Sequence, residues 1–200
     1  MIPLHSIIKQ EAQAILRIPD ETASQIGILS NVLCKQTNTI ITSGMGKAGL
    51  IAQQFAFTLC SIGVPAFFLN PAEAQHGDLG MIRKKDIIIL FSNSGQTREV
   101  IEMVELILKI YPTILIALVT GNADSPLTKQ SQLILLTGNP AEVCPLGLTP
   151  TTSTTVMSVI SDMIIVRMIE LLHLTPETYY QYHHSGYLGQ QAKQMIRKEK

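Results

Sequence analysis

Short runs of apolar, often β-branched residues alternate along the middle of the chain with stretches whose apolar residues recur every three or four positions. The runs lack polar alternation, which is typical of strands covered on both faces, and the periodic stretches are typical of amphipathic helices. Strands are predicted at residues 39–42, 64–69, 86–91, 113–119 and 132–136, and helices between them at residues 47–62 and 97–110. Strands that alternate with helices in this way predict a parallel sheet with crossover helices.

Helical patterns also flank the alternating region. Residues 4–35 predict two helices broken at Pro19-Asp20, and residues 152–172 predict one long helix. The segment 137–151 between the last strand and this helix is rich in glycine and proline, and a loop of that length in a compact domain is usually functional. We predict one α/β domain, a three-layer sandwich around a five-stranded parallel sheet. It divides into an N-terminal helical segment 1–36, an α/β core 37–175 and a C-terminal helical segment 176–200.

Composition narrows the class of protein. Hydrophobic residues make up 46% of the chain and charged residues 15%, below the charged share of about 25% in typical domains. This balance argues against disorder and indicates that a partner subunit covers part of the surface. Fifteen basic and fifteen acidic residues give a net charge of zero, so the basic footprint that nucleic acid requires is absent.

Cysteine usage and hydropathy exclude further classes. The three cysteines are widely separated, and they form neither a disulfide framework nor a metal-binding knuckle. The first residues lack the pattern of a signal peptide. The most apolar long stretch, residues 156–172, is interrupted by Asp162, Arg167 and Glu170, so it is too polar to cross a membrane. We therefore expect a cytoplasmic protein that contacts neither nucleic acid nor membrane.

A glycine-rich turn follows the first predicted strand, at Ser43-Gly44-Met45-Gly46-Lys47-Ala48-Gly49. Its G-x-G-x-x-G spacing matches the dinucleotide-binding fingerprint, which also needs an acidic residue at the end of the next strand. That strand ends in Leu69-Asn70, and the spacing of a Walker phosphate loop is absent as well. A turn that lets backbone N–H groups approach an anion at a helix N-terminus fits better.

Small polar residues also follow the third predicted strand, at Ser92-Asn93-Ser94-Gly95-Gln96-Thr97. Three hydroxyls, an amide and a glycine before a helix are suited to hold a phosphate, because the helix N-terminus favours negative charge. A capped turn is the alternative, with Thr97 or Ser94 as the N-cap. A cap uses one such residue and leaves the others unexplained.

Three further segments carry candidate chemistry. His76-Gly77-Asp78 precedes the third strand, and alone such a sequence is more often a turn than a catalytic group. The run Thr151-Thr152-Ser153-Thr154-Thr155 has more hydroxyls than a helix cap uses. Adjacent His183 and His184 cannot both reach one ion from a helix, and no further ligand is in register, so we predict no metal site.

Together these segments resemble the sugar isomerase (SIS) domain family, and within it the D-arabinose-5-phosphate isomerases of the Kdo pathway. The resemblance covers nearly the whole chain and rests on Ser43–Gly49, Pro71–Met81, Ser92–Thr97 with Glu99, Glu142–Gly147 and Pro150–Thr155. It implies a flavodoxin-like, doubly wound fold and the reversible conversion of D-ribulose 5-phosphate to D-arabinose 5-phosphate through an enediol, without a cofactor. It also implies a tetramer whose sites are shared between subunits. Members commonly append a pair of CBS domains beyond the point where this sequence stops, so the resemblance is to a short form of the enzyme. The resemblance also implies that the product supplies Kdo biosynthesis, and through it lipopolysaccharide or capsule synthesis.

The resemblance also assigns residues to the site. Substrate binding falls to the two polar turns and the start of the last long helix: Ser43, Gly44, Gly46, Ser92, Asn93, Ser94, Gly95, Thr97, Thr152 and Ser153. The catalytic set is His184, His76, Lys47, Glu99 and Glu142. His184 is the first choice for the base and His76 for the acid, and the sequence leaves the reverse assignment open. Glu99 has an alternative role as a helix first-turn carboxylate. The family's His-Pro-Gly-Gly segment reads His184-Ser185-Gly186-Tyr187 here, which keeps the histidine and alters the loop.

Two other functions stay open at this point. Some SIS domains are sugar-phosphate-binding regulators without catalysis, and these need a phosphate cradle but no acid or base. The second alternative is an isomerase that acts on another ketose phosphate. The retained His76, Glu99, Glu142 and His184 favour an enzyme.

Overall fold

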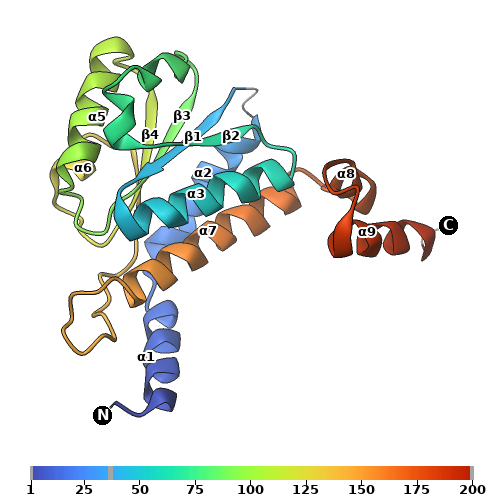
Figure 1. Cartoon of the computed structure of the whole chain (residues 1–200), viewed down its shortest axis with the longest axis horizontal. Coiled ribbons are helices and arrows are strands. Elements are labelled where there is room, and N and C mark those ends of the chain that lie inside the picture. The colour runs from blue at the N-terminus through green and yellow to red at the C-terminus, as the bar shows by residue number, and fades with distance from the viewer. Residues whose placement is uncertain (1, 36–37, 199–200) are drawn as a thin grey trace.

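A computed structural model describes residues 2–35 and 38–198. Five strands form one parallel sheet in the order β2-β1-β3-β4-β5, with bounds β1 Ile40–Gly44, β2 Ala66–Leu69, β3 Ile87–Phe91, β4 Leu115–Thr120 and β5 Leu133–Leu136 (Figure 1). Every predicted strand is present, and the pairing register confirms that all neighbours run parallel. The predicted three-layer α/β fold is therefore confirmed.

Helices cover both faces of the sheet. α2 (Asp20–Lys35), α3 (Gly46–Ser61) and α7 (Thr152–Leu171) pack on one face, and α5 (Arg98–Ile110), α4 (Pro71–Ala74) and α6 (Pro126–Lys129) lie on the other. A 3-10 turn, η1, spans Asp78–Met81. The four-residue elements α4, η1 and α6 were not predicted, because a single turn shows no apolar periodicity.

The central strands are apolar at every position because each face meets its own helical layer. In β3, Ile87, Ile89 and Phe91 pack toward α3 and α7. Their neighbours Ile88 and Leu90 pack toward α5. All five residues of this strand are buried, as expected when successive side chains of a strand point to opposite faces of a covered sheet.

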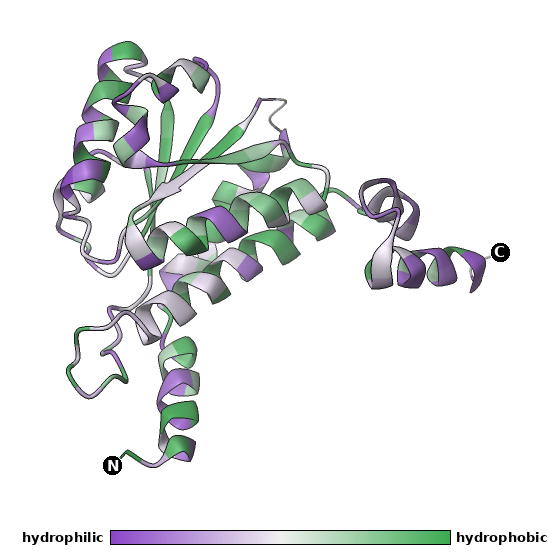
Figure 2. Ribbon diagram, in the orientation of Figure 1, coloured by the Kyte–Doolittle hydropathy of each residue, from purple (hydrophilic) through white to green (hydrophobic). Residues whose placement is uncertain are grey.

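Three helices extend away from this body (Figure 1). α1 (Leu4–Leu16) buries none of its residues. α8 (Pro176–Tyr182) and α9 (Gly186–Lys198) pack mainly on each other beyond the end of α7, and Figure 2 shows that their surfaces are largely hydrophilic. None of the helices in the described ranges is both long and apolar enough to cross a membrane.

Parallel strands place all their carboxyl ends at one edge of the sheet. At this edge Gly44 is level with Phe91, and Phe91 is level with Val119 on the next strand. The segments that follow β1, β3, β4 and β5 therefore meet there, although about 90 residues of sequence separate the first from the last. In sheets of this kind ligands bind outside the carboxyl ends of the strands.

Candidate active site

A cavity of about 730 Å³ opens at this edge of the sheet. It lies between the segments that follow β1, β3 and β5 and the first turns of α7. Its lining comprises Met45, Gly46, Lys47, Ala48, Phe91, Ser92, Asn93, Ser94, Thr97, Asn139, Pro140, Ala141, Glu142, Gly147, Leu148, Pro150, Ser153, Thr154 and Met157. Eight of the fifteen residues that the sequence assigned to the site line it: Gly46, Lys47, Ser92, Asn93, Ser94, Thr97, Glu142 and Ser153.

The turn between β3 and α5 forms a hydroxyl-lined wall of the cavity. Ser92 Oγ and Thr97 Oγ1 share a hydrogen bond of 3.2 Å, and the Gln96 N–H donates to Ser94 Oγ over 3.2 Å. Gly95 has a φ of +64°, a conformation that glycine adopts without strain. Thr97 occupies the N-cap position, but its side chain makes no cap hydrogen bond. Its hydroxyl stays beside Ser92 on the cavity wall, which the capped-turn alternative does not explain.

The glycine-rich turn after β1 brings a second helix N-terminus to the cavity. A Cβ on Gly49 would lie 2.5 Å from the Gly44 carbonyl oxygen, so only glycine lets α3 approach the strand end this closely. Gly46 has a φ of +60° and starts the helix, and Lys47 follows on the cavity wall. The glycines of the apparent dinucleotide fingerprint therefore serve a tight strand-to-helix turn.

Three helix N-termini converge on this cavity. Gly46 of α3, Thr97 before α5 and Ser153 of α7 all line it. Each helix start carries unpaired backbone N–H groups and the positive end of the helix dipole. Together with the Lys47 ammonium, they give the cavity a positive potential suited to a phosphate or another small anion.

Glu142 ties the loop after β5 to the start of α7. Its Oε2 accepts hydrogen bonds from the Thr151 N–H (2.7 Å), the Thr151 hydroxyl (2.9 Å) and the Ser153 N–H (3.3 Å). Partial burial acts to raise the pKa of this carboxyl, but hydrogen bonds from Ser153 and Thr151 outweigh it and hold the pKa below its ordinary value. Glu142 is therefore a carboxylate at neutral pH that caps α7.

Most hydroxyls of the Thr151–Thr155 run are used inside the protein. Thr154 and Thr155 both donate to the Thr151 carbonyl oxygen. Thr152 is buried, and its hydroxyl donates to Glu11 Oε1 over 3.0 Å and accepts from the Val143 N–H over 3.1 Å. The Thr152 hydroxyl therefore links α1 to the cavity loop, and Thr152 itself does not line the cavity. The long run of hydroxyls reflects these internal bonds.

Three other predicted binding residues shape the edge of the sheet without lining the cavity. Ser43 is fully buried, and its hydroxyl donates to the Leu69 carbonyl oxygen over 2.6 Å on the α5 side of the sheet. Gly44 packs against α3 and against the backbone of Phe91, and Gly95 lies against Ser125. Ser43 is thus buried outside the cavity lining, and its contact with a substrate stays a prediction.

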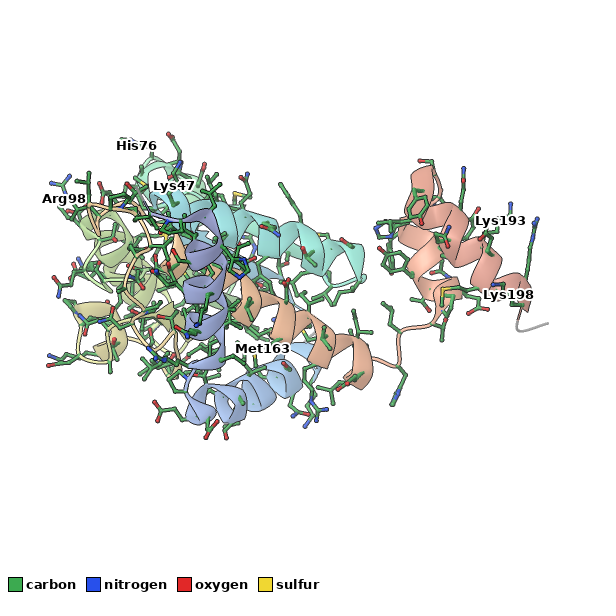
Figure 3. The ribbon with its side chains drawn as sticks, turned by 90° about the horizontal axis from the view of Figure 1, so that it is seen from below. Lys47, His76, Arg98, Met163, Lys193 and Lys198 are labelled. Atoms are coloured by element: carbon green, nitrogen blue, oxygen red, sulfur yellow. The ribbon has the colours of Figure 1, made fainter. Side chains whose placement is uncertain are left out.

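The predicted acid–base residues Glu99 and His76 lie at the same edge of the sheet but outside the cavity lining. Glu99 is half-buried in the first turn of α5, which agrees with its alternative role at a helix N-terminus. His76 is exposed in the turn after α4, and its backbone N–H donates to the Glu73 carbonyl oxygen over 2.8 Å. Figure 3 places His76 and Lys47 on the α/β body, on the same side in that view.

His184 lies at the other end of the molecule, between α8 and α9. Its ring meets Tyr180 edge-on, with ring centroids 5.8 Å apart. The nearby Tyr182 ring covers Gly63 at the C-terminal end of α3, whereas Gly46 at the N-terminal end lines the cavity. The 16 residues of α3 span about 24 Å. His184 therefore does not reach the cavity of its own chain. In Figure 3, Lys193 and Lys198 mark α9, which lies with α8 apart from the α/β body.

The loop after β5 contributes cavity residues that the sequence motifs did not single out, among them Asn139, Pro140 and Ala141. Their signals were that they directly follow a predicted strand of a parallel sheet and that they belong to the long loop 137–151, which was expected to be functional. Within the described residues, no three His, Cys, Asp or Glu side chains are grouped so as to hold a metal ion.

Comparison with known proteins places this geometry in a family context. The SIS domain family matches residues 33–167. Arabinose 5-phosphate isomerase KdsD of Pseudomonas aeruginosa is 41% identical over 75% of this chain and 45% of its own length. Arabinose 5-phosphate isomerase KpsF of Escherichia coli is 41% identical over 80% of this chain and 50% of its own length. The chain thus spans about half the length of these curated relatives.

Solved structures match over most of their length. A protein of Bacteroides fragilis, proposed to be a phosphosugar isomerase involved in capsule formation, is 46% identical with a TM-score of 0.86, over 92% of this chain and 97% of that one. The c3406 protein of Escherichia coli CFT073, in complex with arabinose 5-phosphate, is 33% identical with a TM-score of 0.82, over 88% of this chain and 93% of that one. The likeness in both cases extends well beyond the sheet to most of the chain.

Proposed function

Because the chain belongs to the SIS domain family, we propose that it is an aldose–ketose isomerase that interconverts D-ribulose 5-phosphate and D-arabinose 5-phosphate. The observation that carries the proposal is the convergence of three helix N-termini, the Ser92 to Thr97 hydroxyls and Lys47 on one cavity. The naming of 41% identical relatives as arabinose 5-phosphate isomerases supports the choice of reaction, as does the arabinose 5-phosphate complex of a 33% identical protein.

The phosphate of the substrate is assigned to the β3–α5 turn. Ser92, Ser94 and Thr97 supply hydroxyl donors, and the first turn of α5 supplies N–H groups. Ser153 at the start of α7 closes the site from the other side. Binding of the phosphate holds the sugar in place, so that binding energy from a non-reacting group positions the reacting carbons.

Isomerisation moves a proton between C1 and C2. A base removes a proton from C1 of ribulose 5-phosphate while an acid protonates the C2 carbonyl oxygen, which gives the 1,2-enediol. A proton then adds to C2 and the O1 hydroxyl loses its proton, which leaves the aldehyde of arabinose 5-phosphate. We assign the base to His184 and the acid to His76, because histidine transfers protons near neutral pH. The Lys47 ammonium stabilises negative charge that develops on the oxygens.

This assignment requires a second copy of the chain. His184 lies about one helix length from the cavity of its own chain, so a neighbouring subunit must deliver it. The surface agrees with burial in an oligomer, since large apolar side chains such as Leu50, Phe57 and Val166 are more than half exposed. We propose a homo-oligomer, a tetramer, whose sites are shared between subunits.

A substrate panel with two variants tests the function. The protein should convert ribulose 5-phosphate faster than hexulose or heptulose phosphates. Ser94→Ala should raise KM about tenfold through loss of one hydrogen bond to a charged group, whereas His184→Ala should lower kcat about 100- to 10,000-fold. Ser61→Ala removes a hydroxyl at the far end of α3 and serves as the matched control. Wild-type turnover in His184→Ala would show that another group is the base.

A regulatory sugar-phosphate sensor is the second candidate. One observation favours it: within the described part of a single chain, no histidine lines the cavity. A sensor would bind the sugar phosphate and leave it unchanged. Binding of ribulose 5-phosphate without any turnover by the assembled oligomer would therefore decide for the sensor.

A further inference from the structure

Two asparagine side chains meet at the inner wall of the cavity, at a place that the phosphate cradle does not use. Asn93 follows β3 and Asn139 follows β5, and both line the cavity. Gly121 lies between them, directly after β4. A Cβ on Gly121 would lie 2.7 Å from Asn93 Oδ1 and 3.0 Å from Asn139 Oδ1. Both amide oxygens thus lie against the Cα of Gly121, where any larger residue would collide with them.

The Asn93 amide has an unused acceptor. Its Oδ1 is buried and has no hydrogen-bond partner in the described part of the chain. The backbone carbonyl oxygen of the same residue, in contrast, accepts from the Gly121 N–H and from the Thr120 hydroxyl. A buried acceptor without a partner is rare in folded proteins and calls for a physical explanation.

Asn139 is held in an unusual conformation on the opposite side of the same space. Its φ is +48°, a region that few residues other than glycine occupy, although asparagine tolerates it better than most. The Asn139 N–H donates to Thr137 Oγ1 over 3.4 Å, which helps fix the turn. The side chain itself is not engaged by any of the hydrogen bonds described for this loop. Local strain of this kind is more common at functional sites than elsewhere.

The chemistry of the two amides separates them from the phosphate cradle. A phosphate dianion offers acceptor oxygens only, so it has nothing to donate to an amide oxygen. A sugar hydroxyl is both donor and acceptor and pairs with either end of an amide. We propose that Asn93 and Asn139, spaced by Gly121, form a subsite for the chain hydroxyls of the substrate. This proposal rests on the proposed function in so far as the ligand is a sugar phosphate.

A third asparagine offers a contrast. Asn122 donates from Nδ2 to the Ser94 carbonyl oxygen over 3.0 Å, and its Oδ1 accepts from the Asp124 N–H over 3.0 Å. Its amide is thus occupied at both ends and does not line the cavity. It positions Ser94, and its loss should affect the phosphate end of a ligand rather than the hydroxyls.

Binding of two matched ligands tests the subsite without depending on catalysis. D-arabinitol 5-phosphate carries the phosphate and the chain hydroxyls but no carbonyl, so it cannot isomerise, and n-pentyl phosphate has the same carbon count without the hydroxyls. Asn139→Gly removes the amide and suits the backbone. This variant should weaken the binding of arabinitol phosphate about fivefold to tenfold, which is the effect of one hydrogen bond. Its dissociation constant for pentyl phosphate should stay within about twofold of that of the unmodified protein. Gly121→Ala, whose methyl group would displace the two amide oxygens, should show the same selectivity.

Asn122→Ala is the matched control and should weaken both ligands alike. Dissociation constants come from ligand-observed NMR titration of the assembled protein, with thermal melting to confirm that each variant is folded. The subsite is overturned if Asn139→Gly weakens both ligands equally or neither, or if the unmodified protein does not prefer arabinitol phosphate over pentyl phosphate. Absence of isomerisation would overturn the proposed function and leave this comparison intact.

Discussion

At the scale of single residues, Glu142 shows how one carboxylate can organise a whole wall of the cavity. Its Oε2 receives three hydrogen bonds from Thr151 and Ser153, and it faces the positive end of the α7 dipole. The loop that carries Glu142 also carries the cavity residues Ala141 and Pro140. Whatever Glu142 does in the reaction, its first effect is to hold this loop against α7.

The effect of replacing this carboxylate on the free energy of unfolding should depend on pH. Glu142→Gln removes the charge that favours the hydrogen bonds and should lower the free energy of unfolding by about 1 kcal/mol at pH 7, as loss of a helix cap does. Because the pKa of Glu142 is lowered in the folded state, its contribution is complete above the unfolded-state pKa and is lost as the pH falls through the folded-state pKa. Urea unfolding of both proteins should therefore show a difference at pH 7 that shrinks below about pH 4. A difference that stays constant across this range would contradict the capping role.

Cys144, two residues further along the same loop, should be a reactive thiol. Its sulfur is partly exposed and accepts hydrogen bonds from the Leu148 N–H (3.3 Å) and the Thr149 N–H (3.2 Å). Desolvation acts to raise its pKa, but these backbone hydrogen bonds outweigh it and lower the pKa. Burial raises the pKa of the Cys34 thiol. Iodoacetamide at pH 7.5, followed by mass spectrometry of each cysteine peptide, should alkylate Cys144 faster than Cys34, and equal rates would contradict this environment.

Which hydroxyls line the cavity could be predicted only in part. Ser92, Ser94 and Thr97 were expected there because polar residues that follow a strand of a parallel sheet lie at its ligand-binding edge. That Ser43 lies outside the lining could not be foreseen, because a strand covered on both faces gives no polar alternation to show where each side chain points. That Thr152 lies outside it could not be foreseen either, because its partner Glu11 lies 141 residues away. Asn139 carried no motif at all.

At the scale of elements, the approach of α3 to β1 depends on two glycines. A Cβ on Gly44 would lie 3.2 Å from the Gly49 backbone nitrogen, and a Cβ on Gly49 would lie 2.5 Å from the Gly44 carbonyl oxygen. Backbone atoms cannot move aside as a flexible side chain can. The element order and layers were predictable from periodicity, but this close contact was visible in the sequence only as a weak glycine motif.

A pair of glycine-to-alanine variants tests this contact. Gly49→Ala should lower the free energy of unfolding by about 1–3 kcal/mol, because the methyl group overpacks the strand end. Gly27→Ala, within α2, places a Cβ where nothing lies within 4 Å and should raise it by about 0.5–1 kcal/mol. Both values come from urea unfolding. Equal effects of the two substitutions would mean that α3 does not pack against β1 as described.

At the scale of the whole molecule, the separation of α8 and α9 from the cavity is the feature that sequence reasoning could not foresee. The family resemblance assigned His76, His184 and the phosphate cradle to one site and implied that sites are shared between subunits, but it did not show which residues of one chain lie apart. The structure places His184 beyond the far end of α3, a distance that appears only once the chain is folded. The proposed reaction therefore needs assembly as well as folding.

Mixed oligomers test this requirement. Lys47→Ala and His184→Ala should each be nearly inactive alone, because Lys47 lies in the cavity and the proposed mechanism takes its base from His184 of a neighbouring subunit. Co-expression of the two variants should restore about one quarter of the sites, since random assembly pairs an intact cavity with an intact His184 at that frequency. Activity of the mixture no greater than that of the separate variants would show that subunits do not share sites.

The central claim is that this cavity carries a sugar phosphate through an enediol, and proton exchange with solvent tests it most directly. Ribulose 5-phosphate is incubated with the assembled protein in heavy water and followed by NMR. The account predicts arabinose 5-phosphate that carries deuterium at C2, formed by the unmodified protein and not by His184→Ala. Unchanged ribulose 5-phosphate, or product entirely free of deuterium, would contradict it.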